Sequence, residues 1–97
     1  MASYISLLQF TEQGVRNVKD TTKRAEAAKA LAAKVGVKIN DVYWTMGAYD
    51  LVLISEAPDD ETMTACSLSL AALGNVKTQT LRAFRAKEVD AILGKMK

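Results

Sequence analysis

The sequence predicts an α+β fold in which helices cover one face of a four-stranded antiparallel sheet. Segments prone to β or helical structure follow one another in the order strand, helix, strand, strand, helix, strand, and a short helix ends the chain. The first and third strands are apolar on both faces, which suits the centre of a sheet, whereas the fourth strand is mixed. This βαββαβ order is that of the ferredoxin-like fold, in which the strands lie in the order 4-1-3-2.

The first strand is predicted over Tyr4–Phe10, a segment with apolar side chains on both faces. One face would carry Ile5 and Leu7, and the other would carry Tyr4, Leu8 and Phe10. The polar segment Thr11–Lys19 follows, and its Gly14 predicts a connection with no more than one short helical turn.

The first helix is predicted to begin at a cap formed by Asp20 and Thr21 and to end at Gly36. The Ala-rich run between these positions has a high helix propensity. Its small side chains would let the helix lie close to the sheet. The stripe expected to face the sheet consists of Ala25, Ala28, Leu31, Ala32 and Val35.

A β-hairpin is predicted next, in a stretch that holds the only Trp and two of the three Tyr residues. Its arms would extend over Val37–Met46 and Tyr49–Glu56. Gly47 and Ala48 between the arms suit a two-residue type II′ turn, which places its first residue at positive φ.

The second half of the chain predicts a helix, a strand and a last helix. Pro58 ends the third strand, and the acidic run Asp59–Glu61 is placed at the positive end of a second helix. The fourth strand is expected over Asn75–Phe84 and the last helix over Lys87–Met96. Apolar side chains recur at helical spacing in both helices: Met63, Cys66, Leu70 and Leu73 in one, and Val89, Ile92, Leu93 and Met96 in the other.

Composition restricts the class of protein. The 97 residues correspond to one domain, 1–97, and an apolar share of 49% is typical of a folded chain. A net charge of +2 gives no indication of a nucleic-acid or membrane partner, and no segment is long and apolar enough to span a membrane. The single cysteine and the lack of a signal-peptide pattern at the N-terminus favour a cytoplasmic protein.

Two helices would cover only one face of the sheet, yet both faces carry large apolar side chains. A bare apolar face usually marks an interface. We therefore expect a homodimer in which two sheets pack face to face, with the last helix helping to cover the interface.

Asp50 and Tyr49 are candidates for a catalytic site, because Asp at the start of a central strand is unusual. In one interpretation Asp50 braces the hairpin by accepting hydrogen bonds from nearby backbone or from the hydroxyls of Thr45 or Tyr43. In the other it is an acid or base at the mouth of a cavity between sheet and helices. The brace is favoured, since perturbed carboxylates are more often structural than catalytic.

The candidates for ligand binding are Trp44, Tyr43, Arg16, Asn17 and Arg82. The two aromatic residues are adjacent, so one would face the helices and the other the open side, where packing accounts for both. The polar residues would suit an anionic small molecule if they converged, although a solvated loop with surface ion pairs is the simpler account.

The absence of His and the presence of one Cys restrict the chemistry further. No metal site is expected, because capping explains the one acidic cluster, Asp59–Glu61. No Ser-His-Asp or Cys-His set and no phosphate-binding Gly loop can be assembled, and Cys66 is expected to pack as a small hydrophobe. We therefore expect no cofactor.

The hairpin segment Trp44–Asp50 contains Gly, Tyr and Asp in the arrangement Gly-Ala-Tyr-Asp and resembles the signature of the GYD family. Segments around Gln13–Lys19, Leu73–Val76 and Thr80–Phe84 are similar to that family too. The resemblance implies a small bacterial or archaeal protein with the dimeric α/β-barrel version of the ferredoxin-like fold. It implies no agreed biochemical function.

The sequence therefore favours a non-enzymatic domain that oligomerises and binds a small molecule or a partner protein. The alternative is a cofactor-independent enzyme, similar to monooxygenases or isomerases, that uses Asp50 or Tyr49 in an apolar pocket beside Trp44. The two interpretations differ in one observable, because an enzyme needs an enclosed pocket of roughly 300 Å³ or more with a polar group directed into it.

Overall fold

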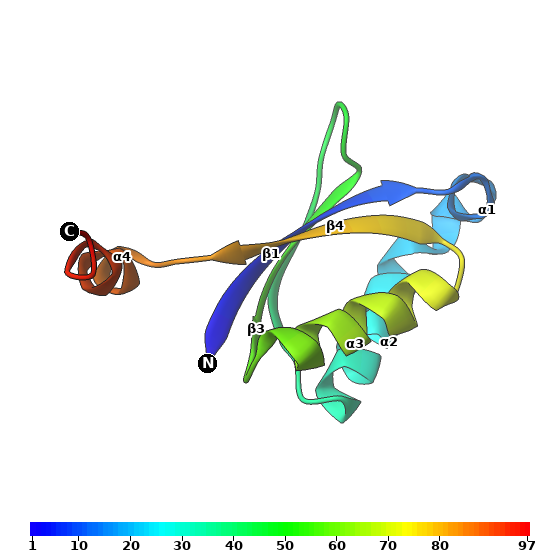
Figure 1. The fold of residues 1–97 in the computed structure, drawn as a ribbon. Coiled ribbons are helices and arrows are strands. Elements are labelled where there is room, and N and C mark those ends of the chain that lie inside the picture. Colours follow the sequence, from blue (N-terminus) through cyan, green and yellow to red (C-terminus); the bar gives the residue numbers. More distant parts are fainter.

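A four-stranded antiparallel sheet with helices on one face forms the body of the protein, as Figure 1 shows. The computed structural model describes all residues, 1–97. Its elements in chain order are β1 (Ala2–Phe10), α1 (Glu12–Arg16), the 3₁₀ turn η1 (Val18–Asp20), α2 (Thr21–Lys34), β2 (Lys38–Trp44), β3 (Leu51–Ala57), α3 (Asp60–Ala72), β4 (Val76–Ala83) and α4 (Ala86–Leu93).

The strands lie in the order β2-β3-β1-β4, which is 4-1-3-2 when read from the other edge. β1 and β3 are central, as their apolar composition predicts. Ile5 of β1 pairs with Ile54 of β3 on one side and with Leu81 of β4 on the other. β2 pairs with the free side of β3, and its register shifts between Ile39 and Asp41, where one extra residue is accommodated as in a β-bulge.

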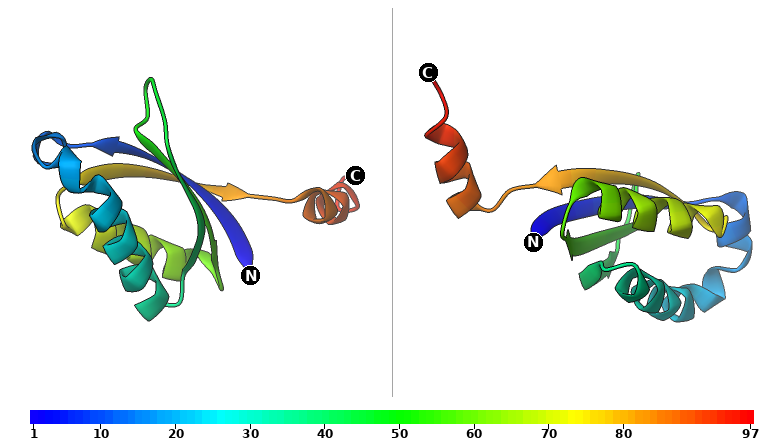
Figure 2. Two further views of the ribbon diagram at one scale, coloured as in Figure 1. Left: turned by 180° about the vertical axis from the view of Figure 1, so that it is seen from behind. Right: turned by 60° about the horizontal axis from the view of Figure 1, so that its bottom comes forward.

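Alternation along the central strands decides which side chains face the helices. Tyr4 and Leu8 of β1 are buried beneath α2 and α3, and so are Leu51 and Leu53 of β3. Figure 2 shows both helices on the same side of the sheet. The helices contribute small or flexible side chains to this core, namely Ala32 from α2 and Met63 and Cys66 from α3.

The connection between β1 and α2 contains more helix than the single short turn expected, because α1 is followed directly by η1. The hydroxyl of Thr11 caps α1 by accepting a hydrogen bond from the backbone N–H of Gly14 at 3.1 Å. Asp20 occupies the N-cap position of α2 and the helix begins at Thr21, as predicted, but the Asp20 side chain makes no capping hydrogen bond. The chain enters α2 from a 3₁₀ turn, whereas a capping side chain acts from extended backbone.

The loop between β2 and β3 is longer than the predicted two-residue turn, and the type II′ prediction is wrong. The last strand pair is Trp44 with Leu51, and beyond it the Thr45 N–H donates to the Asp50 carbonyl at 2.9 Å. Residues 46–49 therefore form the loop, with Gly47 at φ +98° as expected. Asp50 belongs to the edge of the β1 ladder, because its N–H donates to the Leu8 carbonyl at 2.8 Å.

α4 projects away from the body of the protein at the end of β4, as the views in Figures 1 and 2 agree. The molecule is accordingly elongated, with extents of 51 × 30 × 18 Å. Val89, Ile92 and Leu93 on the predicted apolar face of this helix are exposed. No helix of the structure has both the length and the apolar composition needed to cross a membrane.

Candidate functional site

The face of the sheet opposite to α2 and α3 carries two rows of apolar side chains. In one row Tyr43, Val52 and Leu7 pair side by side across β2, β3 and β1. In the next row Ile54, Ile5 and Leu81 pair across β3, β1 and β4. The pairing registers thus join apolar side chains from all four strands into one surface, which we call the open face.

No helix of the same chain packs over the open face, as Figure 2 shows. Tyr43 is 57% exposed and Leu81 is 43% exposed, while the four central aliphatic side chains are half-buried by their neighbours. The ends of the rows are polar, with Gln79 beside Leu7 and Asp41 beside Ile54. An apolar centre with polar ends is the usual composition of a protein interface.

α4 presents a second exposed apolar surface. Val89, Ile92 and Leu93 are 38%, 41% and 53% exposed. The base of the helix is held in place, because Glu88 accepts a hydrogen bond from the Arg85 N–H at 3.0 Å and lies 3.4 Å from Arg82. These contacts hold the pKa of the Glu88 carboxyl below its usual value, the backbone hydrogen bond contributing most. An eight-residue helix has little stability by itself in water, so packing against another surface is needed to hold it.

Asp50 acts as a brace between two strands. One carboxylate oxygen accepts a hydrogen bond from the backbone N–H of Phe10 at 2.8 Å. The hydroxyl of Thr45 donates to the Tyr49 carbonyl at 2.6 Å and leaves Asp50 without a hydroxyl partner. The hydrogen bond from Phe10 joins Asp50 to β1, through a donor that the sequence did not indicate.

Tyr49 lies in the loop and is tied to the far edge of the sheet, because its hydroxyl donates to Gln79 of β4 at 2.9 Å. Neither Tyr49 nor Asp50 lines the cavity between the sheet and the helices. Tyr49 of the loop and Asp50 at the edge of the β1 ladder therefore make separate contacts with β4 and β1.

Tyr43 and Trp44 point to opposite faces, as alternation predicts. Tyr43 belongs to the open face. Trp44 lies on the helix side, where its indole N–H donates to the hydroxyl of Thr21 at 3.0 Å.

The polar ligand candidates do not converge. Arg16 pairs with Glu12 at 2.7 Å on the exposed surface of α1, and the Asn17 amide donates to the Gln13 carbonyl. Arg82 lies beside Tyr4 at the other end of β1 from α1. The length of β1 separates Arg82 from Arg16 and Asn17, and the exposed Arg16–Glu12 pair is of the kind that the solvated-loop interpretation describes.

Arg82 and Tyr4 belong to a polar cluster at the start of α3. The hydroxyl of Tyr4 donates to the Asp60 carboxylate at 2.5 Å, and the Arg82 guanidinium lies 5.7 Å from the Tyr4 ring and 4.5 Å from the Phe84 ring. Burial, followed by the hydrogen bond to Asp60, raises the pKa of Tyr4 to about 12. This phenol stays protonated at neutral pH, which makes it a donor and not a base.

Cys66 is fully buried in the core, and burial raises the pKa of its thiol. It packs as a small hydrophobe, as expected. No group of three or more Cys, Asp or Glu side chains comes together in a way that could hold a metal ion.

Comparison with known proteins agrees with these features. The model of the GYD domain family matches residues 4–93. A protein of Thermus thermophilus described as a glutamine synthetase and cystathionine β-lyase binding protein is 34% identical over 94 residues, which cover 96% of this chain and 99% of the relative.

Solved structures have the same fold. A crystal structure of a protein from Thermus thermophilus aligns with a TM-score of 0.59 at 26% identity, covering 89% of this chain and 96% of that one. MtbAldR aligns with a TM-score of 0.67 at 13% identity, and this chain spans about half of its length, 52%. The second likeness concerns the fold alone.

Proposed function

Because this chain belongs to the GYD domain family, and because its sheet has an uncovered apolar face, we propose that it is a non-catalytic domain that pairs with a second copy and binds a partner protein. The open face is the observation that carries the proposal. Its six side chains, Ile5, Leu7, Tyr43, Val52, Ile54 and Leu81, come from all four strands and have no covering element in their own chain.

Self-association removes this surface from water. Burying apolar area contributes roughly 25 cal/mol per Å². Two open faces can pack against each other because each has aliphatic side chains at its centre and polar groups at its ends. We place α4 over the rim of this interface, where its apolar face gains the packing that its own chain does not provide. This arrangement is the dimeric α/β barrel.

The function of the assembled domain is to bind another protein. The relative from Thermus thermophilus supports this, since it is described as binding two enzymes and is related to this chain over nearly its whole length. We infer that enzymes of the same two kinds are the first partners to test. The enzymatic alternative is less well supported, because neither Asp50 nor Tyr49 lines the cavity between the sheet and the helices.

The oligomeric state tests the first part. Light scattering on a size-exclusion column is expected to give twice the 10.5 kDa of one chain. Leu7→Lys places a charge at the centre of the open face and should give a monomer that remains folded by circular dichroism. Leu68→Lys is the matched control, because Leu68 is 66% exposed on α3, away from the open face. A wild-type monomer would overturn the self-association.

Binding to purified enzymes tests the second part. The protein is immobilised, and glutamine synthetase and cystathionine β-lyase from the same source organism are passed over it. Saturable binding of at least one is expected, with a loss in the Leu7→Lys variant if the pair is the binding unit. If neither enzyme binds to the wild-type protein, the partner assignment is wrong. Self-association is still decided separately, by the light-scattering measurement.

A further inference from the structure

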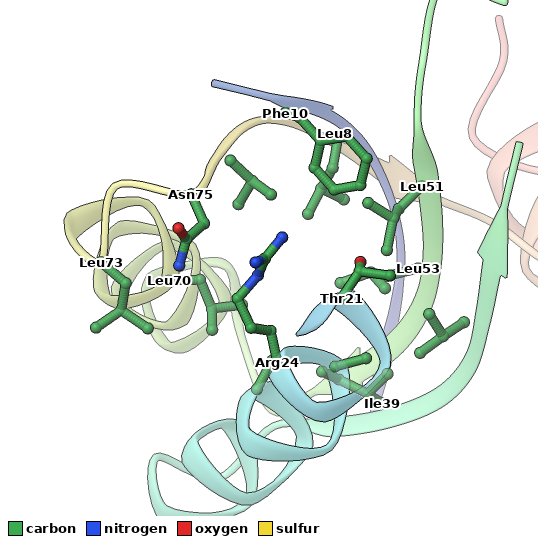
Figure 3. A pocket seen from close by; sticks show the side chains of 14 residues that line it. Leu8, Phe10, Thr21, Arg24, Ile39, Leu51, Leu53, Leu70, Leu73 and Asn75 are labelled. Atoms are coloured by element: carbon green, nitrogen blue, oxygen red, sulfur yellow. The ribbon is translucent and has the colours of Figure 1, made fainter. Parts of the chain in front are cut away.

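We propose that the cavity between the sheet and α2 is a binding site for a short aliphatic carboxylate, with Arg24 as the residue that binds the carboxylate group. This site is distinct from the open face and independent of the proposed partner. The cavity has a volume of about 80 Å³, and Figure 3 shows the Arg24 side chain among the residues that line it. Its walls are apolar and include Leu8, Ile39, Leu51, Leu53, Leu70 and Val76.

Arg24 extends from α2 into the space between Asn75 on one side and Leu8 and Leu51 on the other (Figure 3). Its guanidinium donates to the carbonyl of Gly14 at 3.2 Å and to that of Asn17. It has no acidic partner, since the three ion pairs of the structure are Arg16–Glu12, Lys29–Glu26 and Arg82–Glu88. A guanidinium has five N–H donors, so several remain for an anion.

Two further donors line the cavity. Asn75 accepts a hydrogen bond from Gln13 through its amide oxygen at 2.9 Å, which leaves its NH₂ group without a bond. Thr21 accepts from Trp44 at 3.0 Å, which leaves its own O–H free to donate. No Asp or Glu lines the cavity. Arg24 is thus the one charged side chain among the lining residues, and the acceptors beside it, the carbonyls of Gly14 and Asn17, already receive its hydrogen bonds, so the site suits a carboxylate better than an amine.

The volume sets the length of the apolar tail. An engineered apolar cavity of about 150 Å³ binds benzene. In proportion, a cavity of about 80 Å³ has room for about three carbons, which is the branched end of a four-carbon tail whose first carbon lies beside the carboxylate. The ligand class is therefore a small carboxylic acid with a short unbranched or branched tail, and isovalerate is a suitable probe.

The alternative role of Arg24 is purely structural, because its two bonds to Gly14 and Asn17 attach α2 to the preceding turn. That role predicts a loss of stability in Arg24 variants and no effect on any ligand. The two roles are therefore separated by a binding measurement on folded variants.

The test compares isovalerate with isovaleramide, which has the same tail and no charge. Binding is followed by the fluorescence of Trp44, the only Trp, and by amide chemical shifts of Leu51 and Leu53. Isovalerate is expected to bind with a Kd of about 1 mM, and isovaleramide about tenfold more weakly. Arg24→Gln should remove this preference and leave the two Kd values equal.

A second variant, Ala28→Leu, tests whether the probes bind in the cavity even if the Arg24→Gln protein does not fold. Ala28 lines the cavity and is half-buried, so Ala28→Leu is expected to fill the space, raise the melting temperature and abolish binding of both probes. Equal binding of acid and amide to the wild-type protein would overturn the proposal. So would binding of isovalerate that survives Ala28→Leu, or no binding at concentrations about tenfold above the expected Kd.

Discussion

At the scale of single residues, Gly14 and Gly47 are required for different reasons. A Cβ on Gly14 would lie 2.1 Å from the carbonyl oxygen of Asn75, which is fixed by a hydrogen bond from the Thr11 N–H at 3.1 Å. A Cβ on Gly47 would meet no atom within 4 Å, but the residue has φ +98°. Gly14 therefore has no space for a side chain, whereas Gly47 has space but a backbone conformation that other residues rarely adopt.

We expect Gly14→Ala to lower the free energy of unfolding by about 2 kcal/mol or more, because backbone must move. Gly47→Ala should cost about 1 kcal/mol from the positive φ alone, and Gly47→Val more. Urea denaturation measures both. Gly47→Asn is the control, since Asn tolerates this region and should recover part of the loss. A Gly14→Ala protein as stable as the wild type would contradict the close approach to Asn75.

Tyr4 predicts a dependence of stability on alkaline pH. Its folded pKa of about 12 lies above the ordinary value of 10.0, so the native state retains a proton that the unfolded state releases. The corresponding stability is fully present below pH 10 and is lost as the pH rises from 10 to 12. Melting temperatures across this range should fall more steeply for the wild type than for Tyr4→Phe. Parallel curves for the two proteins would contradict the raised pKa that burial and the hydrogen bond to Asp60 give Tyr4.

At the scale of elements, periodicity and caps predicted most of the fold. Local sequence was enough to predict three features: the alternation in β1 and β3, the helical spacing in α2 and α3, and the Asp at the start of α3. Asp59 is confirmed as the N-cap of α3, where it accepts from the Thr62 N–H at 2.8 Å. Local pattern did not predict how much of the connection after β1 is helical or the length of the hairpin loop, since Thr11 and Asp50 are held by residues far away in sequence, Gly74 and Phe10.

Asp59 and Asp20 form a matched pair at two helix starts. Asp59→Ala is expected to lower the melting temperature by about 5 °C, because it removes a working cap. Asp20→Ala should leave the melting temperature nearly unchanged, since Asp20 makes no capping bond. Thermal denaturation followed by circular dichroism compares them directly, and equal effects of the two substitutions would contradict the assigned caps.

The pH dependence of the Asp59 cap has the opposite sign to that of Tyr4. The side-chain and backbone hydrogen bonds of Thr62 hold the pKa of Asp59 below its ordinary value of 3.8. The charged cap therefore stabilises the fold above that value and loses its effect as the pH falls through the lowered pKa. The difference in melting temperature between the wild type and Asp59→Ala should shrink in acid.

At the scale of the whole molecule, the sequence predicted the surface that remains uncovered but not the cavity. Apolar residues on both faces of β1 and β3 indicate an interface, because two helices cover only one face. Arg24 gave no signal in the sequence, since its spacing in a Lys-rich and Ala-rich helix is that of a solvated residue. Its position at the cavity depends on α1 and η1, which bring the carbonyls of Gly14 and Asn17 to its guanidinium.

The position of α4 leads to a last prediction. A chain that ends at Phe84 lacks the projecting helix, whose apolar side chains are exposed in the single chain. In the Leu7→Lys background, where pairing is expected to be lost, removing α4 should leave the melting temperature unchanged because the helix stabilises little within its own chain. In the wild-type background the same deletion should weaken pairing by about tenfold or more, since the rim of the interface loses apolar area.

Sedimentation equilibrium measures the dissociation constant of the dimer, with and without α4. A deletion that destabilises the Leu7→Lys monomer would show that α4 packs on its own sheet, and an unchanged dimer constant would place α4 outside the interface.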